Sequence, residues 1–205
     1  MTNIDSMNFT ELVSKRRAYR KLKPFDINAD LLQELLKITS LAPSCENNQP
    51  WRFVFVYNDE QLQSMYKVFP NKNKWVENAS LIVGVFSKQE LDCSIDDRDY
   101  YLFDTGIAVA YLMLRATEMG LVAHPTSYYD EGEAKKIMGI PEDMQLITII
   151  AIGKHEDTKK IELSPEQEEA ELVRPKRFSI QYLNYLGNYV EEYEENKKRF
   201  ERVFD

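Results

Sequence analysis

The chain has 205 residues, of which 43% are hydrophobic and 29% are charged, and this composition supports a packed core and excludes wholesale disorder. Acidic residues outnumber basic residues by 34 to 26, which gives a net charge of −8. So acidic a chain lacks the broad basic field that non-specific binding of nucleic acid requires. An anionic ligand must therefore be held by a local cluster of cations.

Signals for several common kinds of site are missing from the sequence. The seven glycines are spaced too widely for a GxGxxG or Walker A loop, and His124 and His155 lie in no metal-spaced cluster. Two cysteines, Cys45 and Cys93, do not make a disulfide framework. The N-terminus has no signal-peptide features, and the longest apolar runs fall short of the roughly 20 residues that a membrane span needs. We expect a cytoplasmic protein with no metal, nucleic-acid or membrane partner, whose chemistry, if it is an enzyme, belongs to a bound cofactor.

Helix and strand signals alternate through the N-terminal half. Asn8 and Glu11 form a capping-box pattern at the start of the first helix, and either Asn28 or Asp30 can cap the second. A strand rich in aromatic and β-branched residues follows the Pro50 break. In chain order we expect a helix over about 8–17, a helix over about 28–42, a strand over 51–57, a helix over about 58–69 and a buried strand over 81–86.

The C-terminal half begins with the longest helix signal, over about 97–119. Its middle, residues 106–114, is apolar all round, which predicts a central helix packed on every side. After it we expect, in chain order, a strand over 121–124, a helix over 130–138 closed by Gly139, a central strand over 144–152, an acidic surface loop over 154–172 and an amphipathic tail helix over 188–205.

These elements predict a single α+β domain over residues 1–205. We expect a core over about 8–183 and a C-terminal helical extension over 184–205. The central sheet should be mixed or mostly antiparallel and flanked by helices, with the long helix buried.

Three short segments carry side chains suited to a cofactor. Residues 16–20 (RRAYR) gather three guanidinium groups, which suit a phosphate, although cations at a helix end also complement the helix dipole. Residues 42–51 (APSCENNQPW) present amide groups between two prolines, which suits the edge of a flat heteroaromatic ligand but also a structural turn. Residues 172–177 (LVRPKR) place three cations around a proline, as a solvated charge run also would.

In combination, these segments resemble the FMN-dependent nitroreductase family. The motifs are RRxxR at 16–20, APSxxNxQPW at 42–51 and R-P-x-R at 174–177, and further matches lie at 118–121, 124–130 and 139–141. The resemblance covers roughly residues 9–182. It implies a nitroreductase-like fold and a domain-swapped homodimer with FMN sites at the interface.

The resemblance also implies roles for individual residues. Arg16 would contact the phosphate or ribityl chain of FMN, together with the late cations, and Arg20 would approach the N1–C2=O edge of the ring. Residues of the 42–51 loop would reach the flavin from the partner subunit. The full set implied at the cofactor is Arg16, Arg17, Ala18, Arg20, Pro43, Ser44, Cys45, Asn47, Asn71, Asn73, Pro125, Thr126, Ser127, Tyr128, Arg174, Lys176 and Arg177.

Four positions in that set leave questions open. Either Asn71 or Asn73 would read the pyrimidine ring, and the spacing does not choose between them, with Lys74 a weaker candidate. The family commonly has serine where Ala18 stands, and glycine near the N5 edge where Tyr128 stands. The first departure leaves more of the phosphate binding to the arginines, and the second would narrow the substrate pocket.

The implied activity is an FMN-dependent NAD(P)H oxidoreductase with ping-pong kinetics. NAD(P)H would reduce FMN at N5, and a small aromatic acceptor (a nitroaromatic, a quinone or a flavin) would then take the hydride, so no side chain need act as catalyst. The alternatives are a dehalogenase-like flavin enzyme, which the short segment Ser87–Asp96 disfavours because such enzymes usually insert a lid there, and a non-catalytic flavin-binding protein. A cysteine-dependent enzyme using Cys45 lacks an evident base.

Overall fold

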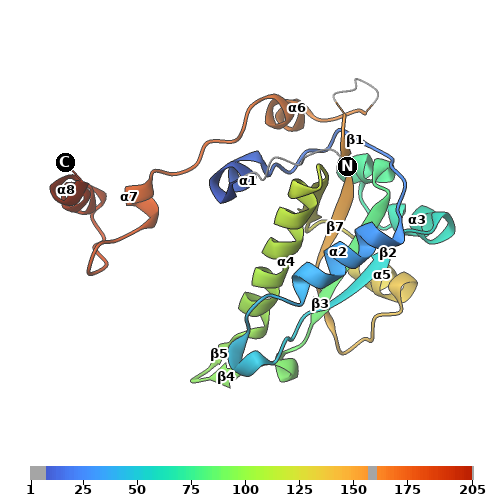
Figure 1. Ribbon diagram of the computed structural model, residues 1–205, viewed down its shortest axis with the longest axis horizontal. Coiled ribbons are helices and arrows are strands. Elements are labelled where there is room, and N and C mark those ends of the chain that lie inside the picture. The colour runs from blue at the N-terminus through green and yellow to red at the C-terminus, as the bar shows by residue number, and fades with distance from the viewer. Residues whose placement is uncertain (1–7, 157–160, 205) are drawn as a thin grey trace. The chain divides into compact units, whose positions relative to one another are not determined.

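The computed structural model describes residues 8–156 and 161–204 (Figure 1). Its contacts separate two compact units, Met1–Leu172 and Val173–Asp205. The larger unit holds the main sheet and its covering helices, and the smaller holds two helices. A single domain with a boundary near residue 184 stays a prediction.

The main sheet has five strands, and each pair in it is antiparallel. Its order is β1–β7–β3–β2, and β6 also pairs with β7. Of the two predicted forms, mixed or mostly antiparallel, the structure has the antiparallel one. The strand bounds are β1 (Leu22–Lys23), β2 (Arg52–Val56), β3 (Leu81–Ser87), β6 (Val122–Thr126) and β7 (Gln145–His155).

Two of these strands depart from the predicted bounds. β6 continues two residues beyond the expected 121–124, through Pro125 to Thr126, and pairs with β7. Proline has no N–H to donate and is tolerated in a strand with an unpaired side. β1 has only two residues and therefore carries no periodic signal that a sequence could show.

The helices of the larger unit follow their predicted capping residues. Asn8 and Glu11 form both bonds of the capping box, Asn28 rather than Asp30 caps the second helix, and Gly139 closes the fifth with a left-handed φ of 67°. The bounds are α1 (Phe9–Lys15), α2 (Ala29–Thr39), α3 (Asp59–Tyr66), α4 (Tyr101–Glu118), α5 (Glu131–Met138) and α6 (Pro165–Leu172), with 3-10 turns at η1 (Cys45–Asn47), η2 (Asn71–Asn78) and η3 (Gln89–Leu91).

Alternate residues of β7 build a core on each face of the sheet. Ile149 and Ala151 join the cluster formed with η2, α3 and α5, whereas Ile150 and Ile152 join the cluster formed with α2 and α4. Both faces are covered, so the central strand reads as a continuous apolar run. This packing fixes the positions of β6 and β7. The predicted site residues Pro125 and Thr126 lie on β6, and Ser127 and Tyr128 follow it directly.

The long helix α4 differs from its prediction in two ways. It begins at Tyr101 rather than near residue 97, because β4 (Ser94–Ile95) and β5 (Arg98–Asp99) form a small hairpin before it. It is also buried along one face only, since the sheet and α2 cover that side while Leu102 and Phe103 are exposed. Packing on every side is therefore wrong for the chain by itself.

The acidic stretch 154–172 was expected to be a loop, and this is wrong for much of its length. β7 continues to His155, and α6 occupies the last eight residues of the stretch. Four residues of the stretch, 157–160, lie outside the described residues. The hydropathy pattern does not reveal α6, because the residue that the helix buries, Glu171, is charged.

The smaller unit contains α7 (Ile180–Leu183), which was not predicted, and α8 (Tyr193–Phe204). α8 begins five residues after the expected start at 188, and the predicted end, Asp205, lies outside the described residues. Asn196 of α8 is buried and donates to the carbonyl oxygens of Gln181 and Asn184, which ties the two helices together. The tail helix itself is confirmed.

Candidate functional site

The arginine segment 16–21 is held by the end of α6. Glu171 is 7% exposed, and its Oε1 accepts a 2.6 Å hydrogen bond from the backbone N–H of Arg20, while Oε2 accepts one of 3.4 Å from that of Lys21. Lys21 Nζ also lies 2.9 Å from Glu168 Oε2. The backbone that carries the arginines is thus fixed by carboxylates that lie some 150 residues later in the chain.

Arg17 is directed toward α6. Its Nη2 donates to the carbonyl oxygen of Ala170 at 2.6 Å, and its guanidinium lies 4.8 Å from the centre of the Tyr19 ring. The Tyr19 ring in turn stacks on His155, with 3.8 Å between the ring centres. Free carbonyls at a helix C-terminus attract cations, so these contacts give Arg17 a role in holding the segment.

Arg20 is half-buried, and this burial lowers the pKa of its guanidinium, against the opposing effect of Glu171. The guanidinium keeps its charge, since an arginine pKa remains far above neutrality. A cation that has lost part of its hydration is stabilised by an anionic ligand placed against it. Arg20 therefore has the electrostatic setting expected of a ligand-binding residue.

His124 on β6 faces the same segment. Burial, followed by the charges of Arg20 and Arg16, lowers its pKa to about 4, although a backbone hydrogen bond to Tyr19 opposes the shift. Its Nδ1 lies 3.1 Å from the Tyr19 carbonyl oxygen, which can only accept, so the proton of the neutral ring is on Nδ1. The imidazole adds no positive charge beside the arginines at neutral pH.

The structure distinguishes the two candidate asparagines. Asn73 is buried, and its Nδ2 donates to Thr126 Oγ1 at 2.9 Å and to the Tyr128 carbonyl oxygen at 3.1 Å. Asn71 is exposed at the start of η2. The structure thus brings Asn73, Thr126 and Tyr128 together at the end of β6, next to Pro125 and Ser127 in the chain.

Tyr128, where the resemblance leads us to expect a glycine, leaves its side chain exposed. The ring is 59% exposed, and the ammonium of Lys72 lies 3.0 Å from its centre. The backbone carbonyl of Tyr128 still points to Asn73. The tyrosine side chain therefore alters the surface next to the end of β6, and the backbone carbonyl of Tyr128 still accepts its hydrogen bond from Asn73.

The 42–51 loop contains a disulfide. Cys45 and Cys93 are bonded across 48 residues of sequence, a pairing that two cysteines allow but that the sequence reading did not predict. The backbone N–H of Cys45 donates to Asp104 Oδ2 at 2.6 Å, and Ser44 Oγ accepts from the N–H of Gln49. These bonds place the loop at the N-terminal end of α4, with Pro43 and Asn47 flanking Ser44 and Cys45.

The arginine segment lies at the opposite end of α4. α1, which leads into Arg16, contacts α4 near its C-terminal end (Figure 1), and His124 follows that end by six residues. A helix of 18 residues is about 27 Å long. Within one chain, the 16–20 and 42–51 motifs are therefore far apart.

The late cations belong to the smaller unit. Lys176 and Arg177 are exposed and Arg174 is half-buried, and Arg177 Nη1 donates to the Pro175 carbonyl oxygen at 3.4 Å. Ala18 lies within the arginine segment, where it offers no hydroxyl. That the late cations meet Arg16 at one phosphate stays a prediction.

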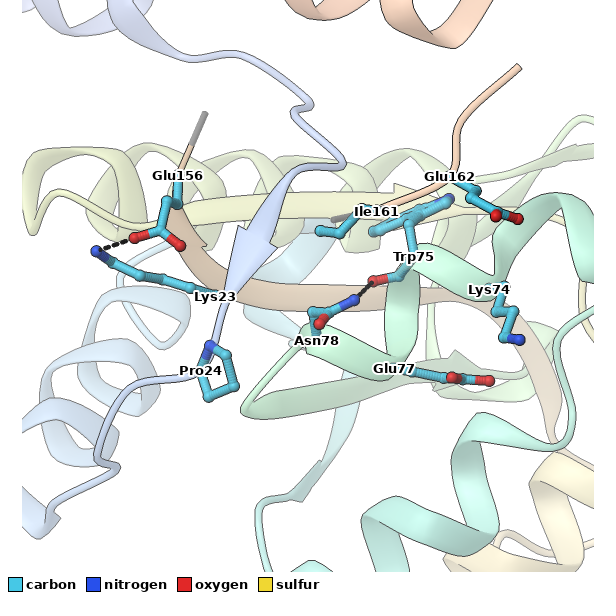
Figure 2. A pocket seen from close by; sticks show the side chains of 9 residues that line it. All are labelled: Lys23, Pro24, Lys74, Trp75, Glu77, Asn78, Glu156, Ile161 and Glu162. Carbon is cyan, nitrogen blue, oxygen red and sulfur yellow. Dashed lines mark hydrogen bonds and ion pairs between the residues drawn. The ribbon is translucent and has the colours of Figure 1, made fainter. Parts of the chain in front are cut away.

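A cavity of about 450 Å³ opens beside η2 (Figure 2). Lys23 and Lys74 are its cations, but Lys23 is paired with Glu156 at 2.8 Å, and Glu77 and Glu162 add further negative charge. Such a lining does not suit a phosphate. The full lining is Lys23, Pro24, Lys74, Trp75, Glu77, Asn78, Glu156, Ile161 and Glu162, which contains Lys74 but none of the residues implied at the cofactor.

Two residues of the arginine site were missed by the sequence reading. Glu171 sits in an acidic stretch, where nothing separates it from its exposed neighbours. His124 was recognised only as part of a motif, although its single imidazole next to a strand was a usable signal.

No helix among the described residues is both long and apolar enough to cross a membrane.

Comparison with known proteins agrees with this fold. Two overlapping stretches, residues 13–78 and 70–154, match the model of the nitroreductase family. An Archaeoglobus fulgidus protein whose name places it among NADH dehydrogenases/NAD(P)H nitroreductases is 28% identical over 153 residues, covering 73% of this chain and 86% of the relative. An iodotyrosine deiodinase of Thermotoga neapolitana is 26% identical over 174 residues, covering 73% of this chain and 89% of the relative.

A solved structure shares the architecture. A crystal structure described as an oxidoreductase containing FMN aligns with a TM-score of 0.77 at 24% identity, over 88% of this chain and 92% of that chain. The predicted nitroreductase-like fold is confirmed. Because the family model spans well over half of the sequence, the chain belongs to the nitroreductase family.

Proposed function

We propose that the chain is an FMN-dependent NAD(P)H oxidoreductase that passes hydride by a ping-pong mechanism to nitroaromatics, quinones or flavins. Family membership supports this, as do the names of the NAD(P)H nitroreductase relative and of the FMN-containing structure of the same fold. When bound, FMN supplies the atom that accepts and donates hydride. The protein must then bind the cofactor, orient it and leave one face open.

The residues on the arginine segment and β6 fit this cofactor. Arg20 offers a partly desolvated cation for the N1–C2=O edge, and the neutral ring of His124 lies beside it without competing for the anion. Asn73 donates both Nδ2 hydrogens to Thr126 and Tyr128, and its Oδ1, which accepts from Trp75 Nε1 at 3.4 Å, keeps a lone pair that can accept from the pyrimidine ring. Arg16, with Arg174, Lys176 and Arg177, would hold the phosphate, and the backbone at Ser127 and Tyr128 would face N5.

We infer that a second copy of the chain completes the site. The 42–51 loop and the arginine segment lie at opposite ends of α4, so one chain does not bring Ser44 and Arg20 together. α4 also leaves Leu102 and Phe103 uncovered, which gives a partner an apolar face to bury. A homodimer in which each loop reaches the partner's flavin accounts for both features.

The observation that carries the proposal is that β6 places His124 beside Arg20 and, at its last residue, Thr126 against Asn73. The test is to purify the full chain and measure bound flavin by absorbance, then titrate FMN by fluorescence. We expect a yellow protein that oxidises NAD(P)H when a quinone or a nitroaromatic is added. A colourless protein that ignores added FMN would overturn the proposal.

A dehalogenase-like activity is the second candidate, and the Thermotoga relative named as an iodotyrosine deiodinase favours it. Between β3 and α4 the structure has only η3 and the β4–β5 hairpin, which is less than the lid expected of such enzymes. The two candidates differ in product, because only the dehalogenase releases iodide from an iodinated tyrosine. Iodide measurement on the reduced protein decides between them.

A further inference from the structure

The Cys45–Cys93 disulfide has an environment suited to opening and closing in the folded protein. Both residues are only half-buried, so a small thiol can approach. The side-chain amide of Asn48 donates to Cys93 Sγ at 3.4 Å. A donor at this distance stabilises the negative charge of a thiolate, which makes Cys93 the better leaving sulfur.

Two carboxyl groups bracket the bond. Asp104 is 3% exposed and accepts from the Cys45 N–H, while Asp92 Oδ1 accepts from the Cys93 N–H at 2.9 Å. Burial raises the pKa of Asp92, and the neighbouring Asp104 raises it further. Asp92 Oδ2 is buried and faces no hydrogen-bond partner within the described part of the chain. The side-chain amide of Asn48 donates to Asp92 Oδ1 at 3.4 Å as well as to Cys93 Sγ, so the same amide links the Asp92 carboxyl group to the sulfur, and this carboxyl group is placed to supply a proton to it.

The 44–49 loop, which carries Cys45, is conformationally strained. Glu46, Asn47 and Gln49 have left-handed φ values of 49°, 61° and 49°, which residues with a Cβ rarely adopt. Such backbone persists only where surrounding bonds hold it. The disulfide to Cys93 is one of the bonds that hold this loop.

We propose that Cys45–Cys93 is a thiol–disulfide exchange site, at which an external dithiol reduces the bond and releases the loop 44–49 from residues 92–93, which precede the β4–β5 hairpin. This assignment concerns the chain's own sulfurs. It rests on the proposed function only in giving the released loop a role at the flavin of the partner subunit.

The dithiol supplies both electrons that the reduction of the disulfide needs. One thiolate of the reductant attacks Cys45 Sγ, the bond between the two protein sulfurs breaks, and Cys93 Sγ leaves as a thiolate that takes a proton from Asp92. The second thiol of the reductant loses its proton to water and attacks its partner sulfur in the mixed disulfide. Cys45 Sγ then leaves as a thiolate and takes a proton from water, and Asp92 also regains its proton from water. Two electrons pass from the dithiol to the protein, which ends as two thiols, and the reductant ends as a cyclic disulfide.

The first test counts thiols in the full chain as purified, with no FMN added. The protein is equilibrated with mixtures of reduced and oxidised dithiothreitol, quenched in acid, alkylated and weighed by mass spectrometry. We expect two labels to appear together, with an unchanged circular dichroism spectrum, and faster deuterium uptake in the 44–49 peptide after reduction. The proposal is overturned if labelling requires denaturant, if both thiols are free after air oxidation, or if deuterium uptake does not change.

The second test separates a proton donor from a merely structural aspartate. Asp92→Asn should slow reduction several-fold at acidic pH, where the wild-type carboxyl group is protonated, and flatten the dependence of the rate on pH. Asp97→Asn, at a left-handed turn position of the same hairpin, makes the same charge change and should keep the wild-type profile. Parallel pH profiles for both variants would refute the role of Asp92. Neither assay measures hydride transfer or needs added FMN, so a failure of the proposed oxidoreductase function would not alter their outcome.

Discussion

Glu171 Oε1 accepts a hydrogen bond of 2.6 Å from the backbone N–H of Arg20, 151 positions earlier in the chain. This bond ties the segment predicted to meet the flavin ring to the last turn of α6. Arg174, predicted to meet the phosphate, follows Glu171 by three residues. The Glu171 carboxylate therefore anchors the cationic segment 16–20, and in sequence it directly precedes the second cationic segment, 174–177.

Removing the Glu171 carboxylate should both destabilise the protein and weaken the binding of FMN. Glu171→Ala leaves the amides of Arg20 and Lys21 without their acceptor, and buried unpaired N–H groups cost about 1–3 kcal/mol each. We expect the free energy of unfolding in urea to fall by about 2–4 kcal/mol, and by less for Glu171→Gln, which keeps one acceptor oxygen. Glu169→Gln, exposed on the same helix, is the matched control and should change neither stability nor FMN affinity.

The two asparagines of η2 provide a second pair of variants. Asn73→Ala removes the donor to Thr126 and Tyr128 and the amide proposed for the pyrimidine ring, so FMN affinity should fall about tenfold or more, at about 1.4 kcal/mol per tenfold. Asn71→Ala alters an exposed residue and should bind FMN as the wild type does. Fluorescence titration measures both. Equal losses, or a larger loss for Asn71→Ala, would show that the assignment to Asn73 is wrong.

Local signals predicted much of this fold. Asn8 with Glu11, Asn28 and Gly139 mark helix ends through bonds within a few residues, and these boundaries are correct to within one or two positions. The alternation of β7 between two cores is also visible in its unbroken apolar run. Such features depend on neighbours in sequence, which a sequence displays directly.

Features that depend on distant partners were not predictable in the same way. The pairing of Glu171 with Arg20 and the bond between Cys45 and Cys93 join residues far apart in the chain. The middle of α4 is apolar all round, yet the helix is buried along one face of the chain. Its composition predicts burial but does not say whether the same chain or a second one covers each face. The choice of Asn73 over Asn71 needed the position of Thr126.

His124 should make stability depend on pH. Its pKa in the folded chain is about 4, against an ordinary value of 6.5, so between these values the unfolded chain binds more protons than the folded one. The free energy of unfolding should therefore be highest above pH 6.5 and fall by roughly 3 kcal/mol as the pH drops toward 4, at 1.36 kcal/mol per pKa unit. His124→Gln cannot titrate and should show a flatter profile between pH 4 and 7 in urea titrations. An identical slope in this variant would contradict the assignment.

The uncovered face of α4 predicts how assembly and cofactor binding are linked. Phe103 is 66% exposed in the chain, and a homodimer that buries it would tolerate no charge there. Phe103→Glu should shift the protein from dimer to monomer in sedimentation velocity and lose FMN, since each site would then lack the partner's 42–51 loop. Tyr57→Glu, at a 50% exposed position directly after β2, is the control and should remain dimeric and yellow. A wild-type protein that sediments as a monomer at micromolar concentration, or a Phe103→Glu monomer that keeps full FMN affinity, would show that one chain builds the site alone.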